Sequence, residues 1–256
     1  MALSADERAR YLRHILLPEV GAQGQQKLRA ATVAIIGAGG IGSPAIASLA
    51  AAGVGRLRII DPDTVDLSNL QRQYIHRADV AGALKTASAR DFVEALNPNV
   101  TVEAVNERLD ETNAAKLIAG ADIVLDGVDR FPPRFALNAA TMAARIPLVS
   151  AAVGRFSGYL STFKPWTDKT APCFRCFMPE EPPDAARCET DGVLGPVPAV
   201  LGAMAAMEVL KELLQLGTSL SGRLALYEPL SLATRVLSLP RDPACPDCGG
   251  LKREDA

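Results

Sequence analysis

The amino-acid sequence predicts an α/β fold in which a doubly wound, mainly parallel sheet is followed by an antiparallel C-terminal extension. Up to about residue 150, short apolar runs of strand length alternate with segments of helical pattern. This alternation is typical of a parallel sheet with helices on both faces. After residue 151 the pattern changes, because strand-like runs follow a long Pro-rich segment. The simplest organisation is therefore one α/β domain with an extension.

The expected strands of the parallel part are apolar and rich in β-branched residues, as buried strands are. They span residues 32–36, 57–60, 100–105, 122–126 and 147–150. Helices are expected at 4–17, where Ser4 and Glu7 can form a capping box, and at 23–29, 41–52, 85–96, 114–118 and 135–144. The extension should contain strands at 158–163, 224–227 and 234–239 and a helix at 197–216, whose apolar residues suit the core or a dimer interface.

Length and composition suit a single globular domain over residues 1–256, with N-terminal helices in 1–30, a nucleotide-binding part in 31–150 and a C-terminal part in 151–256. With 27 basic and 29 acidic residues, the chain has no basic excess that would indicate nucleic-acid binding. The charged N-terminus does not resemble a signal peptide. The longest apolar run, 196–209, is shorter than the roughly 20 residues that span a bilayer. A cytoplasmic protein that binds no membrane is expected.

A glycine-rich loop follows the first expected strand and opens a helix. Its residues Gly37, Gly39, Gly40 and Gly42 fit the pattern G-x-G-x-x-G, which lets a phosphate approach the N–H groups of a helix N-terminus. Asp61 ends the second strand, where a carboxylate can accept hydrogen bonds from ribose hydroxyl groups. These two features predict a nucleotide site, and by themselves they suit an NAD-dependent oxidoreductase as well as an ATP-using enzyme.

The polar segment after Asp61 favours ATP. It contains the run Ser68-Asn69-Leu70-Gln71-Arg72, in which Arg72 can bind phosphate through two N–H groups. Lys85 opens the next helix, where a cation is unfavourable for the helix dipole, so a phosphate partner would explain it.

Together, the sequence GAGGIG, the segment DPDTVDLSNLQRQ, Lys85 and the cysteine pairs resemble the MoeB/ThiF/HesA family, closest to its MoeB-type members. These are relatives of the catalytic core of ubiquitin-activating enzymes. The resemblance extends from about Tyr11 to Cys248. It implies a Rossmann-like adenylyltransferase that uses ATP to activate the C-terminal glycine carboxylate of a ubiquitin-like sulfur-carrier protein ending in Gly-Gly.

The resemblance also implies roles for individual residues. Gly40 would lie against the nucleotide, Asp61 would hold the ribose, and the phosphate contacts would come from Asn69, Arg72 and Lys85. Asp129 would hold Mg²⁺; the following Arg130 departs from the asparagine that is frequent in the family. Arg13 matches an arginine that the partner subunit of a homodimer supplies, although an exposed helix arginine is an equal alternative.

Four of the five cysteines form two C-x-x-C pairs, Cys173 with Cys176 and Cys245 with Cys248. Four thiolates at this spacing match a structural Zn²⁺ site, with an iron–sulfur centre or a redox pair as alternatives. The remaining Cys188 resembles the position of a cysteine that bonds covalently to the activated carrier in several members of the family. The alternative is an ordinary loop cysteine.

Two other classes of protein stay open at this point. An NAD(P)-dependent oxidoreductase is favoured only by the glycine loop and Asp61. A catalytically silent partner with the same fold would be expected to lose Arg72, Lys85 or Asp129, and all three are present. If sulfur is transferred, we expect a separate sulfurtransferase or cysteine desulfurase as donor, since no rhodanese-like domain follows Cys248. The carrier and its pathway, such as molybdopterin or thiamin synthesis, are not evident from the residues.

Overall fold

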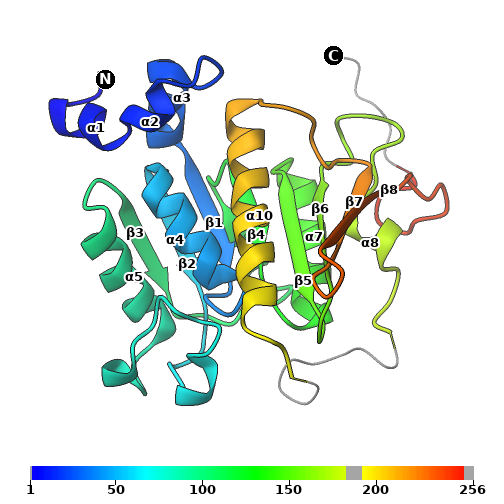
Figure 1. The fold of residues 1–256 in the computed structure, drawn as a ribbon. Helices are drawn as coiled ribbons and strands as arrows, with labels where there is room; N and C mark the ends of the chain where they lie inside the picture. Colours follow the sequence, from blue (N-terminus) through cyan, green and yellow to red (C-terminus); the bar gives the residue numbers. More distant parts are fainter. Residues whose placement is uncertain (1, 183–191, 251–256) are drawn as a thin grey trace.

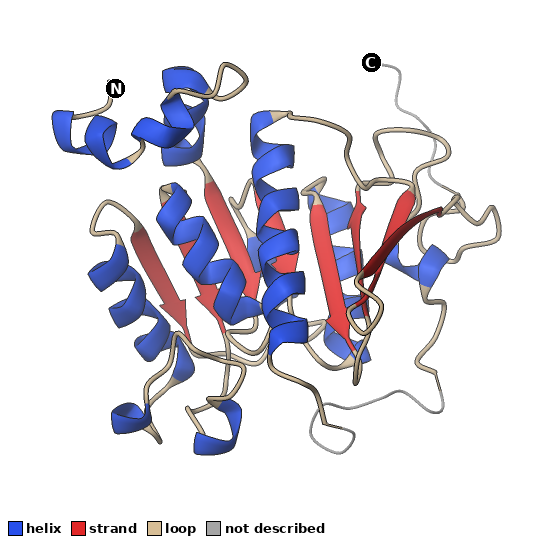
Figure 2. Ribbon diagram, in the orientation of Figure 1, coloured by secondary structure: helices blue, strands red, loops and turns tan. Residues whose placement is uncertain are grey.

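The computed structural model describes residues 2–182 and 192–250, which form one eight-stranded sheet with helices on both faces (Figures 1 and 2). The strand order is β3-β2-β1-β4-β5-β6-β7-β8. Neighbours from β3 to β5 pair in parallel, and those from β5 to β8 pair antiparallel. The predicted fold class is therefore confirmed.

The strands are β1 (Thr32–Ile36), β2 (Arg56–Ile60), β3 (Thr101–Val105), β4 (Ile123–Asp126), β5 (Leu148–Val153), β6 (Gly158–Phe163), β7 (Arg223–Glu228) and β8 (Ala233–Ser238). The helices are α1 (Ala5–Arg10), α2 (Leu12–Ile15), α3 (Gly21–Ala30), α4 (Gly42–Ala52), α5 (Lys85–Leu96), α6 (Ala114–Ile118), α7 (Phe131–Ala144), α8 (Phe174–Phe177) and α10 (Pro196–Leu214), with short 3-10 turns η1 (Leu67–Asn69) and η2 (Ala78–Val80).

Successive side chains of β1 point to opposite faces of the sheet and enter two separate cores, as strand geometry requires. Val33 and Ile35 pack with the helices α4, α5 and α10, which cover the front face in Figure 1. Ala34 and Ile36 pack with α6 and α7 on the other face. Because both faces are covered, the strand is apolar from Val33 to Ile36 and does not alternate.

The N-terminal segment contains two short helices where one was expected at 4–17. The capping box of Ser4 and Glu7 is present, but the helix ends at Arg10 and a second helix begins at Leu12. Tyr11 lies between them, with a buried ring whose hydroxyl accepts a hydrogen bond from Asn97 Nδ2 at 2.8 Å. This tertiary contact interrupts the helix, and no local sequence pattern predicts the interruption.

The helix after β4 begins earlier than predicted, at Phe131 instead of residue 135. Two prolines lie in its first turn, where proline is tolerated because the N–H it lacks has no partner there. No helix in residues 2–182 and 192–250 has both the length and the apolar content that a membrane span requires.

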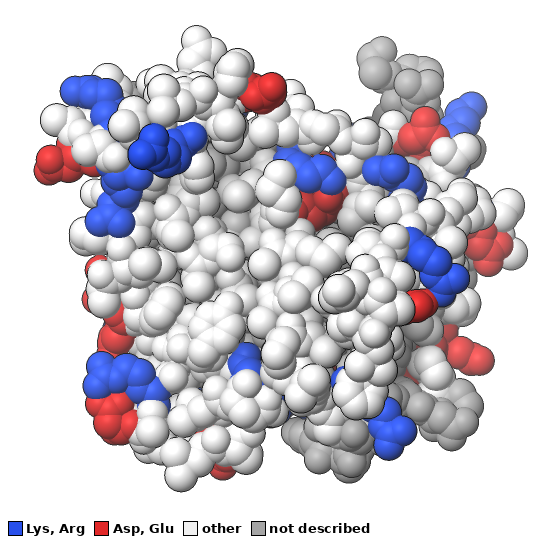
Figure 3. Space-filling model, viewed as in Figure 1, with Lys and Arg blue, Asp and Glu red and all other residues white. Residues whose placement is uncertain are grey.

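Charge is distributed unevenly over the face drawn in Figure 3. Few charged side chains lie over α4 and α10, and basic side chains gather at the end formed by α1 and α2. Large apolar side chains are exposed on α10 and on α2, among them Met207 (54% exposed) and Leu12 (46% exposed).

Candidate active site

A cleft of about 1360 Å³ opens at the carboxyl edge of the parallel strands. The register aligns Ile36 at the end of β1 with Ile60 in β2 and Asp126 in β4, so the loops after these strands start side by side. Most of the predicted site residues line this one cleft: Gly37, Gly39, Gly40, Asp61, Ser68, Asn69, Arg72, Lys85, Asp129 and Arg130.

The glycine loop has the tight geometry that its sequence predicts. Gly37 has a φ of +94°, a backbone conformation that L side chains rarely adopt. At Gly42 a Cβ atom would lie 1.9 Å from the carbonyl oxygen of Gly37, which is far inside van der Waals contact. Gly42 itself does not line the cleft, so its role in the structure is to let the first turn of α4 close over the loop.

Asp61 is buried at the end of β2, with 4% of its surface exposed. One carboxylate oxygen accepts a hydrogen bond from Ala38 N at 2.7 Å and the other from Asp63 N at 2.8 Å. Burial raises the pKa of Asp61, and the nearby charge of Lys85 opposes that rise. Each oxygen retains a second lone pair, so the carboxylate can still accept from a ligand in the cleft.

The segment after Asp61 orients the side chain of Arg72 through hydrogen bonds within the same segment. Asp66 accepts hydrogen bonds from the backbone and hydroxyl group of Ser68 and so begins the turn η1. Arg72 donates to Ser68 O at 3.3 Å and to Asn69 Oδ1 at 3.2 Å. An arginine has five N–H donors, so Arg72 is oriented by this loop and still offers N–H groups to an anion.

Lys85 is a buried cation at the first position of α5, with 6% of its surface exposed. Its Nζ atom lies 3.3 Å from Asp63 Oδ2, and the other oxygen of Asp63 lies 3.6 Å from Arg108 Nη2. Asp63 is half-exposed, so the ion pair can exchange for a ligand phosphate without leaving a buried charge unpaired.

Behind the loop after β4, a buried ion pair fixes the backbone that leads to Asp129. Arg134 on α7 lies 3.6 Å from Asp126 Oδ2 and donates to the carbonyl oxygen of Val128. The other oxygen of Asp126 accepts from Val128 N at 3.0 Å. Asp129 itself is exposed in the cleft wall, where its carboxylate can reach an ion.

Sequence reasoning missed the buried polar residues that support the site: Gln73, His76, Asp126 and Arg134. Gln73 donates to Asn69 Oδ1 at 2.9 Å and so helps to hold the residue that orients Arg72. Gln73 ends the segment DPDTVDLSNLQRQ, but the other three belong to no motif whose spacing signals chemistry, and their roles depend on contacts across the fold. The apolar pair Tyr74-Ile75 directly before His76 is the local signal that could have indicated its burial.

Some of the residues predicted for the nucleotide site do not line this cleft. Leu70 and Gln71 belong to the segment before Arg72 but do not line the cleft. Arg13 is exposed on α2, at the end of the sheet opposite the carboxyl edge of β1 (Figure 1). Cys188 falls outside the described residues.

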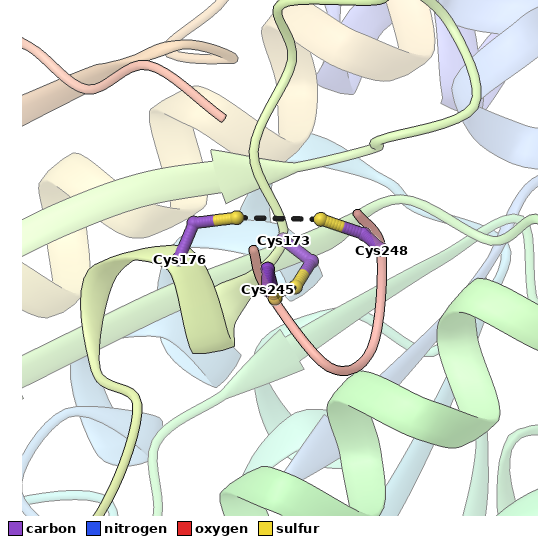
Figure 4. Close-up of side chains that lie close together, drawn as sticks. All are labelled: Cys173, Cys176, Cys245 and Cys248. Carbon is purple, nitrogen blue, oxygen red and sulfur yellow. Dashed lines mark hydrogen bonds between the residues drawn. The ribbon is translucent and has the colours of Figure 1, made fainter. Parts of the chain in front are cut away.

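The other four cysteines come together from two distant segments (Figure 4). The sulfur atoms of Cys173, Cys176, Cys245 and Cys248 all lie within 4.8 Å of one another. The pairs Cys173–Cys245 and Cys176–Cys248 are separated by 3.6 and 3.3 Å. A tetrahedral ion with bonds of about 2.3 Å needs sulfur atoms about 3.8 Å apart, so this cluster fits a metal ion.

Comparisons with known proteins agree with this arrangement. The profile of the ThiF family matches residues 11–247. The SAMP-activating enzyme E1 of Haloferax volcanii is 43% identical over 97% of this chain and 92% of its own. The sulfur carrier protein adenylyltransferase of Thermus thermophilus is 41% identical, over 97% and 93% of the two chains. A crystal structure of E. coli MccB with ATP superposes with a TM-score of 0.80 at 25% identity, covering 94% of this chain and 74% of the other. With a family match over nearly its whole length, the chain belongs to the ThiF family.

Proposed function

We propose that this protein uses Mg-ATP to adenylate the C-terminal carboxylate of a ubiquitin-like sulfur-carrier protein. One observation carries the proposal: a single cleft combines the glycine loop, the ribose-type carboxylate Asp61, the cations Arg72 and Lys85, and Asp129. A dinucleotide site needs the first two features, but it does not need two fixed cations and a second carboxylate.

In this proposal the triphosphate lies between the glycine loop and the two cations. Gly40 lets the glycine loop lie close to the Arg72 segment, because a Cβ atom there would meet Pro198 Cβ at 3.2 Å and Arg72 Cδ at 3.5 Å. Asp61 holds the ribose hydroxyl groups. Arg72, oriented by Asn69, and Lys85, released from Asp63, bind phosphate oxygens.

Asp129 would hold Mg²⁺, with Arg130 beside it contributing a cation to the same wall of the cleft. When bound, the ion neutralises phosphate charge and aligns the phosphate groups for displacement. The exposed carboxylate of Asp129 suits this role, since oxygen ligands are what Mg²⁺ prefers.

In the reaction, a carboxylate oxygen of the carrier attacks the α-phosphorus of ATP. The bond between the α-phosphorus and its bridging oxygen breaks, and pyrophosphate leaves with the bonding electrons. No general base is required, because a carboxyl group is already ionised at neutral pH. Catalysis then consists of positioning and charge stabilisation by Arg72 and Lys85.

The names of two relatives, SAMP-activating enzyme E1 and sulfur carrier protein adenylyltransferase, support a small carrier protein as the substrate. That the carrier ends in Gly-Gly follows from the resemblance to the MoeB/ThiF/HesA family. Its adenylate is an activated acyl group, which a sulfur nucleophile converts to a thiocarboxylate.

We further propose that the protein works as a homodimer and that Arg13 serves the cleft of the partner subunit. Its exposure on α2 supports this, as do the exposed apolar residues and the sparse charge over α10 (Figure 3). An apolar face of this kind favours a permanent interface.

Cys188 is proposed to form a covalent bond to the activated carrier. The sulfur donor is proposed to be a separate sulfurtransferase or cysteine desulfurase. The relative MOCS3 of Mus musculus, an adenylyltransferase and sulfurtransferase, is 43% identical to this chain, which covers 54% of its length. The matching part supports the adenylation half of such a sequence of reactions.

For the four-cysteine cluster we propose a structural Zn²⁺ ion. Four thiolates complete a tetrahedral coordination sphere and leave no position for a substrate. The cluster lies on the side of β5 to β8 and contributes no residue to the cleft.

ATP–pyrophosphate exchange tests the proposed function. We expect exchange that requires both Mg²⁺ and a Gly-Gly-ending carrier, and Asp129→Ala should abolish it while the unfolding temperature stays unchanged. Asp91→Ala, which removes an exposed carboxylate on α5, is the matched control and should retain full exchange. Unaltered exchange in Asp129→Ala would refute its role with Mg²⁺, and NAD binding without ATP binding would refute the proposed function.

A further inference from the structure

His76 lies behind the cleft and is almost completely buried, with 5% of its surface exposed. Both nitrogen atoms of its ring have partners. Nε2 lies 3.0 Å from the carbonyl oxygen of Ala38, in the glycine loop, and Nδ1 lies 3.0 Å from Ser88 Oγ, on α5.

The partners determine the protonation of the ring. A carbonyl oxygen can only accept, so Nε2 carries the hydrogen and donates it to Ala38 O. Nδ1 of the neutral ring then accepts from the hydroxyl group of Ser88. Burial lowers the pKa of His76 and the charge of Lys85 lowers it further, whereas Asp61 and the bond to Ala38 act in the opposite direction. The balance keeps the ring neutral at physiological pH.

Through these bonds His76 connects the elements that carry the nucleotide ligands. Ala38, which accepts from the ring, also donates its N–H group to Asp61 at 2.7 Å. Ser88 follows Lys85 by three residues on the same helix face. His76 lies four residues after Arg72 in the same segment. A second hydrogen bond holds this segment to α4, because Ile75 N donates to Ser43 Oγ at 3.1 Å.

We propose that His76 is a positioning residue for ATP, whose neutral imidazole sets the spacing between the glycine loop, the Arg72 segment and the helix that carries Lys85. It does not line the cleft, so it acts through these groups and touches no substrate atom. A triphosphate bound by several groups at once gains most when they are held in advance at the right distances. The inference rests on the proposed function only in naming ATP as the ligand.

The test compares His76→Phe, which fills the volume without a hydrogen bond, with His76→Gln. The side-chain nitrogen of glutamine, like Nε2 of histidine, lies two bonds beyond Cγ, so it can donate to Ala38 O. Affinity for a non-hydrolysable Mg-ATP analogue is measured by calorimetry, and KM for ATP and for the carrier is measured by pyrophosphate exchange.

We expect His76→Phe to weaken nucleotide binding and raise KM for ATP about tenfold, as the loss of a buried hydrogen bond predicts, with KM for the carrier unchanged. His76→Gln should recover most of the affinity. Ser161→Ala is the control, because it removes a buried hydroxyl group that donates to Arg223 O at 2.8 Å outside the cleft. It should lower the unfolding temperature and leave KM for ATP unchanged.

A purely structural role for His76 predicts a different result. His76→Phe would then lower only the unfolding temperature, or His76→Gln would be no better than His76→Phe, and either outcome overturns the inference. If His76→Phe does not fold, Ser88→Ala replaces it, and a KM for ATP equal to that of the wild type would overturn the inference in the same way. Failure of the wild-type protein to bind Mg-ATP would instead overturn the proposed function.

Discussion

Removal of metal from the cluster of four cysteines is expected to destabilise the C-terminal half of the sheet. The cluster joins the segment after β6, at Cys173 and Cys176, to the segment after β8, at Cys245 and Cys248. While the metal stays bound, these two segments are cross-linked in both the folded and the unfolded chain, much as a disulfide would link them.

The size of the effect follows from the length of chain that the cluster closes. Cys173 and Cys245 are 72 residues apart in the sequence. A cross-link over a loop of this length reduces the entropy of the unfolded chain by an amount worth about 4 kcal/mol at room temperature. For a domain of this size, 1 kcal/mol shifts the unfolding temperature by about 2–4 °C. Loss of the metal should therefore lower it by roughly 10 °C.

The assay combines elemental analysis with thermal unfolding under a strong reductant, which prevents oxidation of the freed thiols. The purified protein should contain about one zinc ion per chain. A chelator should remove the ion and lower the unfolding temperature, and added Zn²⁺ should restore it. Cys188→Ser, which alters the cysteine that belongs to neither C-x-x-C pair, should behave as the wild type does.

Two results would refute this reasoning. Protein purified without any bound metal would show that the cluster is not a metal site under these conditions. If the metal is removed but the unfolding temperature changes by less than about 1 °C, the cluster does not act as a cross-link.

Three further predictions concern the cleft and the groups behind it. Gly42→Ala should abolish adenylation and destabilise the fold, because its Cβ atom would lie 1.9 Å from Gly37 O; pyrophosphate exchange and urea unfolding measure the two effects. Arg134→Met should lower the free energy of unfolding by about 3–5 kcal/mol, because it leaves Asp126 buried without its cation. Burial lowers the pKa of His76, so the unfolded state takes up a proton at a higher pH than the folded state does. The contribution of His76 to the free energy of unfolding should be constant above about pH 6.5 and fall below it by up to about 1.4 kcal/mol per pH unit. Urea titrations at several pH values should find this component absent in His76→Gln.

Each of these predictions has its own control. Gly39→Ala, where the nearest atom to a new Cβ is a side-chain nitrogen at 3.7 Å, should be far milder than Gly42→Ala. Adding Asp126→Asn to Arg134→Met should recover part of the lost stability, and additive losses would contradict a direct pair. A pH dependence identical in the wild type and His76→Gln would mean that another group titrates.

The parallel part of the fold was predictable because its signals are local. The run at 32–36 places apolar residues on both faces of the strand, as expected for a strand that is covered on both sides. Gly37 follows it directly. The position of Asp61 beside the glycine loop follows from parallel pairing, since the ends of β1 and β2 meet at one edge. Where the signal was local, the boundaries were correct to within a few residues.

The remaining features could not be predicted from the sequence, because they depend on contacts between distant residues. The interruption at Tyr11 requires Asn97, 86 residues away. The Arg134 network requires Asp126 on another element, and neither residue stands in a recognisable motif. That the two cysteine pairs lie side by side was a hypothesis from their chemistry. Their separation in the sequence does not indicate how far apart they lie in space.

The separation of the two cysteine pairs also orders events during synthesis of the protein. A ribosome that adds about 5–20 residues per second needs on the order of 4–14 s to pass from the first pair to the second. The four-thiolate cluster can form only when residue 248 has emerged, and by then all eight strands have been made. Metal loading would thus be a late step, and a nascent chain would have to assemble its sheet while Cys173 and Cys176 still lack their partners.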